Sequence, residues 1–163
     1  MSPSPSQTVG PFFGFGLPFA GDQEAVPAAE PGSIRIEGQV IDGEGAPVED
    51  ALLEIAAGEQ FARCSTDMEG AFHFTVRKPA ALADASGTSH APHLEVNVFA
   101  RGLLRHLATR IYFPDEEAAN KADPVLQLVD PARSGTLIAH AEDGALRFDV
   151  HLQGDHETVF FAL

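Results

Sequence analysis

Apolar and polar residues alternate along much of the chain after residue 32. Ile34, Ile36, Gly38 and Val40 fall on one side of this alternation, with charged or polar residues between them. Because successive side chains of an extended strand point to opposite faces, this period of two predicts a strand with one buried face. Similar short segments predict further strands at residues 51–56, 61–65, 71–76, 93–99, 108–113, 126–129, 137–142 and 146–152.

One short helix is expected at residues 115–122, which are acidic and alanine-rich and stop before Pro124. Turn-forming sequences separate the strands. Residues 66–70, for example, provide an Asp that can cap a turn and a Gly that tolerates positive φ. Short strands at this spacing, with at most one short helix, predict an all-β fold: a single antiparallel β-sandwich over residues 33–163.

Residues 1–32 are expected to form an irregular N-terminal arm. They are rich in Pro, Gly, Ala and Phe and show neither a helical nor an alternating period. Phe12, Phe13, Phe15 and Phe19 are too apolar to remain in water, because an exposed apolar cluster favours aggregation. The arm is therefore expected to pack on the sandwich or on a partner chain.

Length and charge limit the classes of partner. A chain of 163 residues fits one domain with a substantial core. Its net charge of −14 comes from 24 acidic and 10 basic residues, and it repels phosphates and anionic lipids over about 8 Å at physiological salt. Nucleic acids and membranes are therefore not expected as partners.

The single cysteine and the N-terminal composition favour the cytoplasm. Cys64 has no second cysteine with which to form an internal disulfide, and its strand-rich surroundings predict an inert buried thiol. No basic residue precedes Arg35, so the positively charged start of a secretory signal is missing. No apolar run approaches the roughly 18 residues that a membrane span requires.

Candidate metal ligands are few. His93 and Glu95 lie two residues apart on a predicted strand and face the same side, but a metal site needs further ligands. The other histidines add no specific short spacing. The sequence also lacks a nucleophile elbow, a phosphate-binding loop, a dinucleotide-binding glycine motif and a Cys-x-x-Cys pair. We therefore assign neither a catalytic nor a metal-binding residue to this chain.

Two features suggest ligand recognition. Arg101, beside Gly102 at the end of an apolar strand, is suited to bind a carboxylate through two hydrogen bonds, although the residues alone favour a solvated arginine in a local salt bridge. Thr8, Gly10 and Pro11 in the arm combine a hydroxyl, a position without a side chain and a rigid ring. The same segment also suits an ordinary docking arm.

Several stretches together resemble one family, the intradiol ring-cleavage dioxygenases, and most closely the alpha-type chains of its two-subunit members. The matching stretches are PSQTVGP (5–11), GQVIDG (38–43), APH (91–93), FARG (99–102), TRIYF (109–113), PVL (124–126), TLIA (136–139), RFDV (147–150) and QGDHETVFF (153–161). They occur in order from the arm to the last residues. This resemblance implies a transthyretin-like (prealbumin-like) β-sandwich.

The resemblance also implies an enzyme. Such enzymes contain Fe(III), combine alpha and beta subunits of similar fold, and cleave an aromatic dihydroxy acid between its hydroxyls with O2. In the family the beta subunit holds the iron with two tyrosines and two histidines, whereas this chain has one tyrosine in total. Glu95 also stands where the family has the second histidine of a His-x-His pair. An alpha-type chain, active only in complex with an iron-bearing beta subunit, is therefore implied.

In such a complex the arm and the strand-end arginine reach the active site at the subunit interface. The resemblance thus implies that Thr8, Gly10, Pro11 and Arg101 bind substrate, with Arg101 on its carboxylate. Residues 57–60 form a shorter connection than is usual for alpha-type chains. That shortening changes the contacts made at this point.

Two other classes of function remain open at this point. The sequences around residues 38–42 and 66–72 also suit transthyretin-like and carboxypeptidase-regulatory-like sandwiches, which would make the chain a non-enzymatic binding module. That reading leaves the first and last segments unexplained. A self-sufficient dioxygenase is disfavoured because the chain has only one tyrosine.

Overall fold

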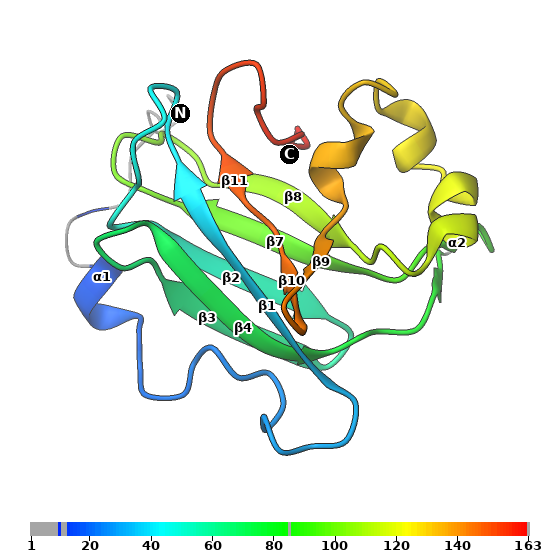
Figure 1. Cartoon of the computed structure of the whole chain (residues 1–163), viewed down its shortest axis with the longest axis horizontal. Helices are drawn as coiled ribbons and strands as arrows, with labels where there is room; N and C mark the ends of the chain where they lie inside the picture. Colours follow the sequence, from blue (N-terminus) through cyan, green and yellow to red (C-terminus); the bar gives the residue numbers. More distant parts are fainter. Residues whose placement is uncertain (1–9, 11–12, 85, 163) are drawn as a thin grey trace, which may run out of the picture.

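Two sheets pack face to face in the computed structural model, which describes residues 10, 13–84 and 86–162 (Figure 1). The first sheet contains β1 (Ser33–Ile41), β4 (Ala71–Arg77), β9 (His140–Glu142), β10 (Ala145–Arg147) and β11 (Val150–His151). The second contains β2 (Leu52–Ala57), β3 (Gln60–Ser65), β7 (His93–Phe99) and β8 (Leu107–Tyr112). The predicted all-β sandwich is confirmed.

The remaining elements are short. They are a hairpin of β5 (Leu82–Ala83) and β6 (Ser89–His90), the helices α1 (Phe13–Gly16) and α2 (Glu117–Ala122), and 3-10 helices at Leu126–Leu128 and Ser134–Leu137. The predicted helix at residues 115–122 corresponds to α2. Of the helices in the described part of the chain, none is long and apolar enough to cross a membrane.

β1 is the central strand of the first sheet. It runs antiparallel to β4, with Ile36 opposite Phe74. Along its other edge it pairs in parallel first with β10, where Ile36 is opposite Leu146, and then with β11, where Val40 is opposite Val150. The sequence predicted only antiparallel pairing. The two parallel pairs arise because the chain turns back at the β9–β10 hairpin and then runs beside β1 in the same direction.

Gly38 lies where β1 passes from β10 to β11. The N–H of Phe148 donates to the carbonyl of Glu37 at 2.8 Å, which brings the Phe148 backbone against β1. A Cβ atom on residue 38 would lie 1.8 Å from the carbonyl oxygen of Phe148. Only glycine leaves room for this close approach of two backbones.

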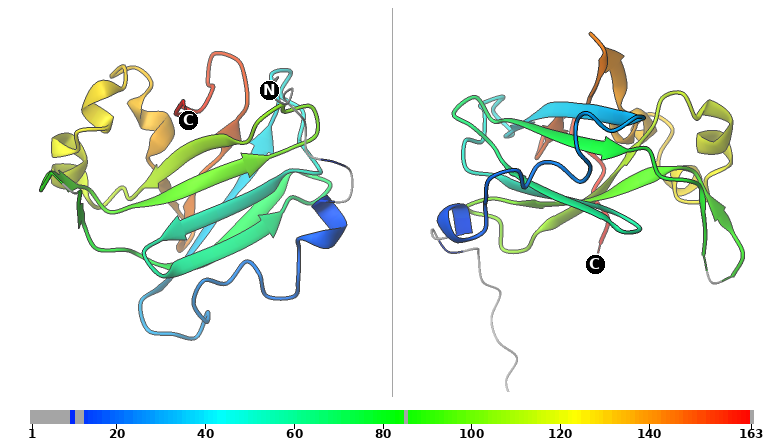
Figure 2. Two further views of the ribbon diagram at one scale, coloured as in Figure 1. Left: turned by 180° about the vertical axis from the view of Figure 1, so that it is seen from behind. Right: turned by 90° about the horizontal axis from the view of Figure 1, so that it is seen from below.

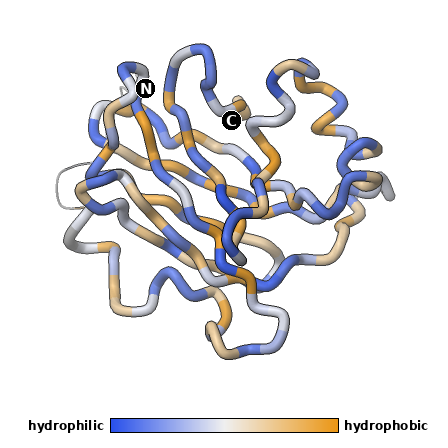
Figure 3. The backbone as a smooth tube through the Cα atoms, in the orientation of Figure 1, coloured by the Kyte–Doolittle hydropathy of each residue, from blue (hydrophilic) through white to orange (hydrophobic). Residues whose placement is uncertain are grey.

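The core lies between the two sheets. Hydrophobic positions recur along the strands with hydrophilic ones between them (Figure 3). Fully buried side chains from both sheets meet there: Ile36, Val40, Phe74, Val76, Leu53, Ile55, Leu94, Val98 and Ile111. Cys64 is buried as predicted, and burial raises the pKa of its thiol. These positions follow the alternation that the sequence predicted.

The described part of the arm runs along the outer edges of β3 and β4 (Figure 2). The N–H of Ala25 donates to the carbonyl of Thr75 at 2.9 Å, and the N–H of Thr75 donates to Gln23 at 3.0 Å. On β3, the N–H of Arg63 donates to the carbonyl of Asp22 at 2.7 Å. The arm therefore covers an edge of each sheet, where unpaired backbone groups would otherwise be exposed.

Between β8 and β9 the chain leaves the sandwich and forms the helical segment on the right of Figure 1. Asp123 begins a turn there, because its Oδ1 accepts the N–H groups of Val125 at 2.9 Å and Leu126 at 3.0 Å. The strand predicted at residues 126–129 is therefore wrong, and a 3-10 helix occupies this position. Of the strand predicted at residues 137–142, only His140–Glu142 belongs to a strand, β9, while Ile138 forms an isolated bridge with Tyr112.

Candidate functional site

Arg101 stands at the end of β7, where the chain turns. The preceding residue, Ala100, is buried, and the following residue, Gly102, has a φ of +86° that favours glycine. The Arg101 side chain is 65% exposed, and its Nε donates to Oδ2 of Asp50. The predicted local salt bridge and the predicted position at the strand end are thus both present.

Asp50 is held in place by its neighbours. The following residue, Ala51, is fully buried, and its N–H donates to Oγ1 of Thr66 at 2.9 Å. The Thr66 hydroxyl in turn donates to the carbonyl of Val48 at 2.7 Å, and the Thr66 N–H donates to the carbonyl of Ala51 at 2.9 Å. The backbone on both sides of Asp50 is therefore fixed to the turn after β3.

A cavity of about 390 Å³ lies between the arm and this region. It is lined by Phe13, Gly14, Glu49, Asp50, Ala51, Ser65, Thr66 and Arg101. The Ser65 hydroxyl is buried and has no hydrogen-bond partner among the described residues. The structure thus brings Arg101 and part of the arm to one cavity that offers a cation.

The other predicted substrate-binding residues belong to the arm. Gly10 is exposed, and its carbonyl accepts the N–H of Phe13 at 3.2 Å, which links it to the lining of the cavity. Thr8 and Pro11 lie outside the described residues. Their assignment to the substrate site stays a prediction.

A second polar cluster joins β7 and β8. Oε1 of Glu95 lies 3.2 Å from Nε2 of His93 and 2.9 Å from Nη2 of Arg110. Nη1 of Arg110 lies 3.3 Å from the Tyr112 hydroxyl, which donates to Oδ1 of Asp123 at 3.1 Å. Sequence reasoning identified His93 and Glu95 but not Arg110 or Asp123, because neither shows a special spacing.

The environment of this cluster shifts several pKa values. Burial raises the pKa of Tyr112 to about 12, so the phenol stays protonated at neutral pH. Burial alone would raise the pKa of Glu95, but its hydrogen bond with His93 and the charge of Arg110 lower it. Burial would also raise the pKa of Asp123, but hydrogen bonds from backbone N–H groups and from the Tyr112 hydroxyl lower it.

This cluster does not fit a metal ion. Nδ1 of His93 lies 2.7 Å from the carbonyl oxygen of Ala91, so both ring nitrogens face oxygen acceptors. The carboxylate of Glu95 is already compensated by Arg110. Across the part of the chain that the structure describes, no three His, Cys, Asp or Glu side chains are grouped so that they could hold a metal ion.

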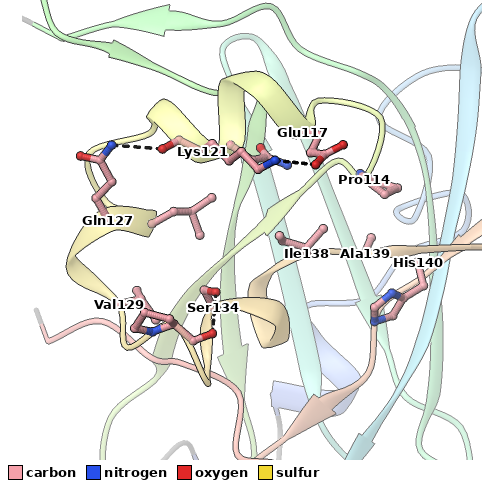
Figure 4. A pocket seen from close by; sticks show the side chains of 12 residues that line it. Pro114, Glu117, Lys121, Gln127, Val129, Ser134, Ile138, Ala139 and His140 are labelled. Carbon is pink, nitrogen blue, oxygen red and sulfur yellow. Dashed lines mark hydrogen bonds and ion pairs between the residues drawn. The ribbon is translucent and has the colours of Figure 1, made fainter.

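A different cavity, of about 490 Å³, lies between α2 and the two 3-10 helices (Figure 4). Its wall is mainly apolar and includes Val129 and Ile138, with the ion pair of Lys121 and Glu117 beside it. The buried Asn120 side chain donates to the carbonyl of Phe113, whereas its Oδ1 has no partner among the described residues. Of the predicted substrate-binding residues, the two that the structure describes, Gly10 and Arg101, do not line this cavity.

The chain is similar to curated proteins over nearly its whole length. It is 40% identical to the protocatechuate 3,4-dioxygenase alpha chain of Burkholderia cepacia, with 97% of this chain and 96% of the relative aligned. It is 41% identical to the alpha chain of the same name from Pseudomonas putida, with 97% and 95% aligned. The protocatechuate 3,4-dioxygenase beta chain of Burkholderia cepacia is 28% identical over 83% of this chain.

Solved structures show a similar fold. The dioxygenase domain of a dioxygenase and carbohydrate-binding protein fusion from Streptomyces sp. SirexAA-E matches with a TM-score of 0.60, covering 97% of this chain and 100% of that domain at 23% identity. No protein-family model matches the chain. The likeness in structure supports the fold, and the likeness in sequence supports the family.

Proposed function

Because the chain belongs to the intradiol ring-cleavage dioxygenases, and among them to the protocatechuate 3,4-dioxygenase alpha chains, we propose that it is the alpha-type subunit of such an enzyme. The reaction joins protocatechuate and O2, breaks the ring bond between the two hydroxyl-bearing carbons and gives 3-carboxy-cis,cis-muconate. Both oxygen atoms of O2 enter the product. The observation that carries this proposal is the alignment with two alpha chains over 97% of the sequence.

We propose that the Fe(III) used by this family is held by a beta-type partner. When bound, Fe(III) activates the aromatic diol for reaction with O2. Two properties of this chain support the proposal that the partner, and not this chain, holds the metal. Its only tyrosine, Tyr112, has a raised pKa and donates to Asp123, which is unfavourable for a phenolate ligand. Arg110 also holds a positive charge against Glu95, where the family has an iron-binding histidine.

The proposed role of this chain is to bind the substrate. Arg101 has three guanidinium nitrogens, and two of them make no hydrogen bond within the described residues while Nε is bound to Asp50. They can donate to both oxygens of the protocatechuate carboxylate, which is the pairing that a planar guanidinium favours. In a protein of net charge −14, such a cation is needed to attract an anionic substrate.

Thr8, Gly10 and Pro11 are proposed to form the pocket wall beside the substrate. Support comes from Phe13 and Gly14, the described arm residues that follow them, because both line the Arg101 cavity. Gly10 is one turn away from them. A position without a side chain lets a flat aromatic ring approach the backbone.

Exposed apolar side chains in and near the arm support the proposal that a partner chain binds there. Phe19 is 63% exposed and Leu17 is 41% exposed in the arm, and Phe61 on the adjacent β3 is 50% exposed. Apolar groups gathered in one region favour a protein interface. A beta-type chain is the proposed partner, since both chain types occur among the relatives. A non-enzymatic binding module would not explain similarity to dioxygenase subunits over the whole chain.

The decisive experiment is O2 uptake with protocatechuate. The chain purified alone is compared with the chain co-purified with its beta-type partner. Uptake only in the complex supports the proposal. Uptake by the isolated chain would contradict the location of the iron, and no uptake by the complex would contradict the proposed substrate.

A further inference from the structure

We propose that Asp50 is a positioning residue for substrate binding: it holds Arg101 through Nε and so directs the two terminal nitrogens toward the substrate carboxylate. This inference rests on the proposed function, in which Arg101 binds protocatechuate. It adds Asp50 to the residues that determine substrate binding. The salt bridge then orients Arg101 as well as neutralising it.

The contact itself uses one edge of the guanidinium. Arg101 makes a single side-chain hydrogen bond within the described residues, from Nε to Oδ2 of Asp50. Nη1 and Nη2 therefore remain available together. Asp50 occupies only Nε. The edge formed by Nη1 and Nη2 is left free, and a second carboxylate can bind there through two parallel hydrogen bonds.

Asp50 and Arg101 differ in conformational freedom. This difference makes Asp50 the residue that orients and Arg101 the residue that is oriented. Asp50 is 30% exposed and stands beside Ala51, which the buried Thr66 binds through its hydroxyl and its backbone. Arg101 is 65% exposed and follows a strand end. A long exposed arginine has many rotamers, and fixing one of them before the substrate arrives lowers the entropic cost of binding.

Asp50 could instead compete with the substrate for Arg101, and its removal would then change substrate affinity in the opposite direction. If Asp50 only competes with the substrate for Arg101, its removal strengthens binding, because one negative charge near an anionic ligand disappears. If Asp50 orients Arg101, its removal weakens binding although the same charge is lost. Glu49 provides a matched control, because it lines the same cavity and makes no hydrogen bond or ion pair with Arg101.

The experiment measures steady-state ring cleavage by the alpha–beta complex. We expect Asp50→Asn to raise KM for protocatechuate by roughly tenfold, the usual effect of losing one charge-assisted hydrogen bond, while kcat stays within about twofold. Glu49→Gln should lower KM slightly. Asp50→Glu, which keeps the carboxylate, should recover most of the loss.

Catechol tests whether the effect acts through the carboxylate. It is protocatechuate without its carboxyl group, and we expect its inhibition constant against ring cleavage to be the same in wild type and Asp50→Asn. Combining Asp50→Asn with Arg101→Ala should raise KM no further than Arg101→Ala alone, because the two residues act as one unit.

Several results would overturn the inference. These are a lower KM in Asp50→Asn, an equal rise in Glu49→Gln, or weaker inhibition by catechol in Asp50→Asn. If Arg101→Ala raises KM and Asp50→Asn does not, only the role of Asp50 fails. If the wild-type complex does not cleave protocatechuate, or Arg101→Ala leaves KM unchanged, the proposed function itself fails.

Discussion

Arg110 on β8 lies directly opposite Glu95 on β7, with Nη2 of the arginine 2.9 Å from Oε1 of the glutamate. The guanidinium of Arg110 therefore compensates the Glu95 carboxylate across the two strands. Within this pair the positive charge of Arg110 balances the negative charge of Glu95. The same contacts tie Tyr112 and Asp123 to the end of the sheet.

Replacing Arg110 by Met should lower the free energy of unfolding by about 1 kcal/mol, because Glu95 and the Tyr112 hydroxyl lose a charged partner. The effect is small because the Glu95 side chain is 53% exposed and screened by water. Urea unfolding of the isolated chain measures it. Lys121→Met breaks an exposed ion pair and should cost less than about 0.5 kcal/mol. Equal values for the two variants would contradict a structural role for Arg110.

Replacing Arg101 by Ala should raise KM for protocatechuate roughly 100-fold in the complex, because the substrate carboxylate loses its charged donor. The iron content of the complex should not change. Steady-state O2 uptake and metal analysis measure the two quantities. Arg105→Ala, which removes an exposed cation four residues away, is the control and should change KM by less than about twofold. An unchanged KM in Arg101→Ala would remove the role assigned to this residue.

The single tyrosine permits a direct test of the pKa of Tyr112 by ultraviolet absorbance, since the chain has no tryptophan. The phenolate should form with a midpoint at about pH 12 in the folded chain, and near pH 10 in concentrated urea. Because folding raises this pKa, the associated stability is fully present below about pH 10. It is lost as pH rises toward about 12. A folded-state midpoint near pH 10 would contradict the buried, hydrogen-bonded phenol.

Replacing Gly38 by Ala should lower the free energy of unfolding by about 3 kcal/mol, because the new Cβ meets the Phe148 backbone, which has no free rotamer to move away. Gly135→Ala is the matched control, because its added Cβ meets nothing within 4 Å. Denaturant unfolding of the two variants gives the comparison. Similar stability in both would mean that β1 and the β10–β11 connection do not approach each other as closely as described.

Local patterns in the sequence determined most of the strands, the main turns and the family. Alternation placed Ile36 and Val40 in the core, since the period of two follows from backbone geometry alone. The turn after β3 was also predictable: Oδ1 of Asp67 accepts the N–H groups of Glu69 and Ala71, and Gly70 has a φ of +70°. These are interactions between near neighbours, which a short stretch of sequence specifies.

Tertiary structure decided the parallel pairs of β1, the 3-10 helix at Leu126–Leu128 and the partners of the functional side chains. Arg101 and Asp50 are 51 residues apart, and no sequence pattern connects them. Their contact depends on how the ends of β2 and β7 are brought together by the sheet. Such contacts form only when the core closes, because burial of apolar side chains from distant strands fixes the positions of the polar groups at their ends.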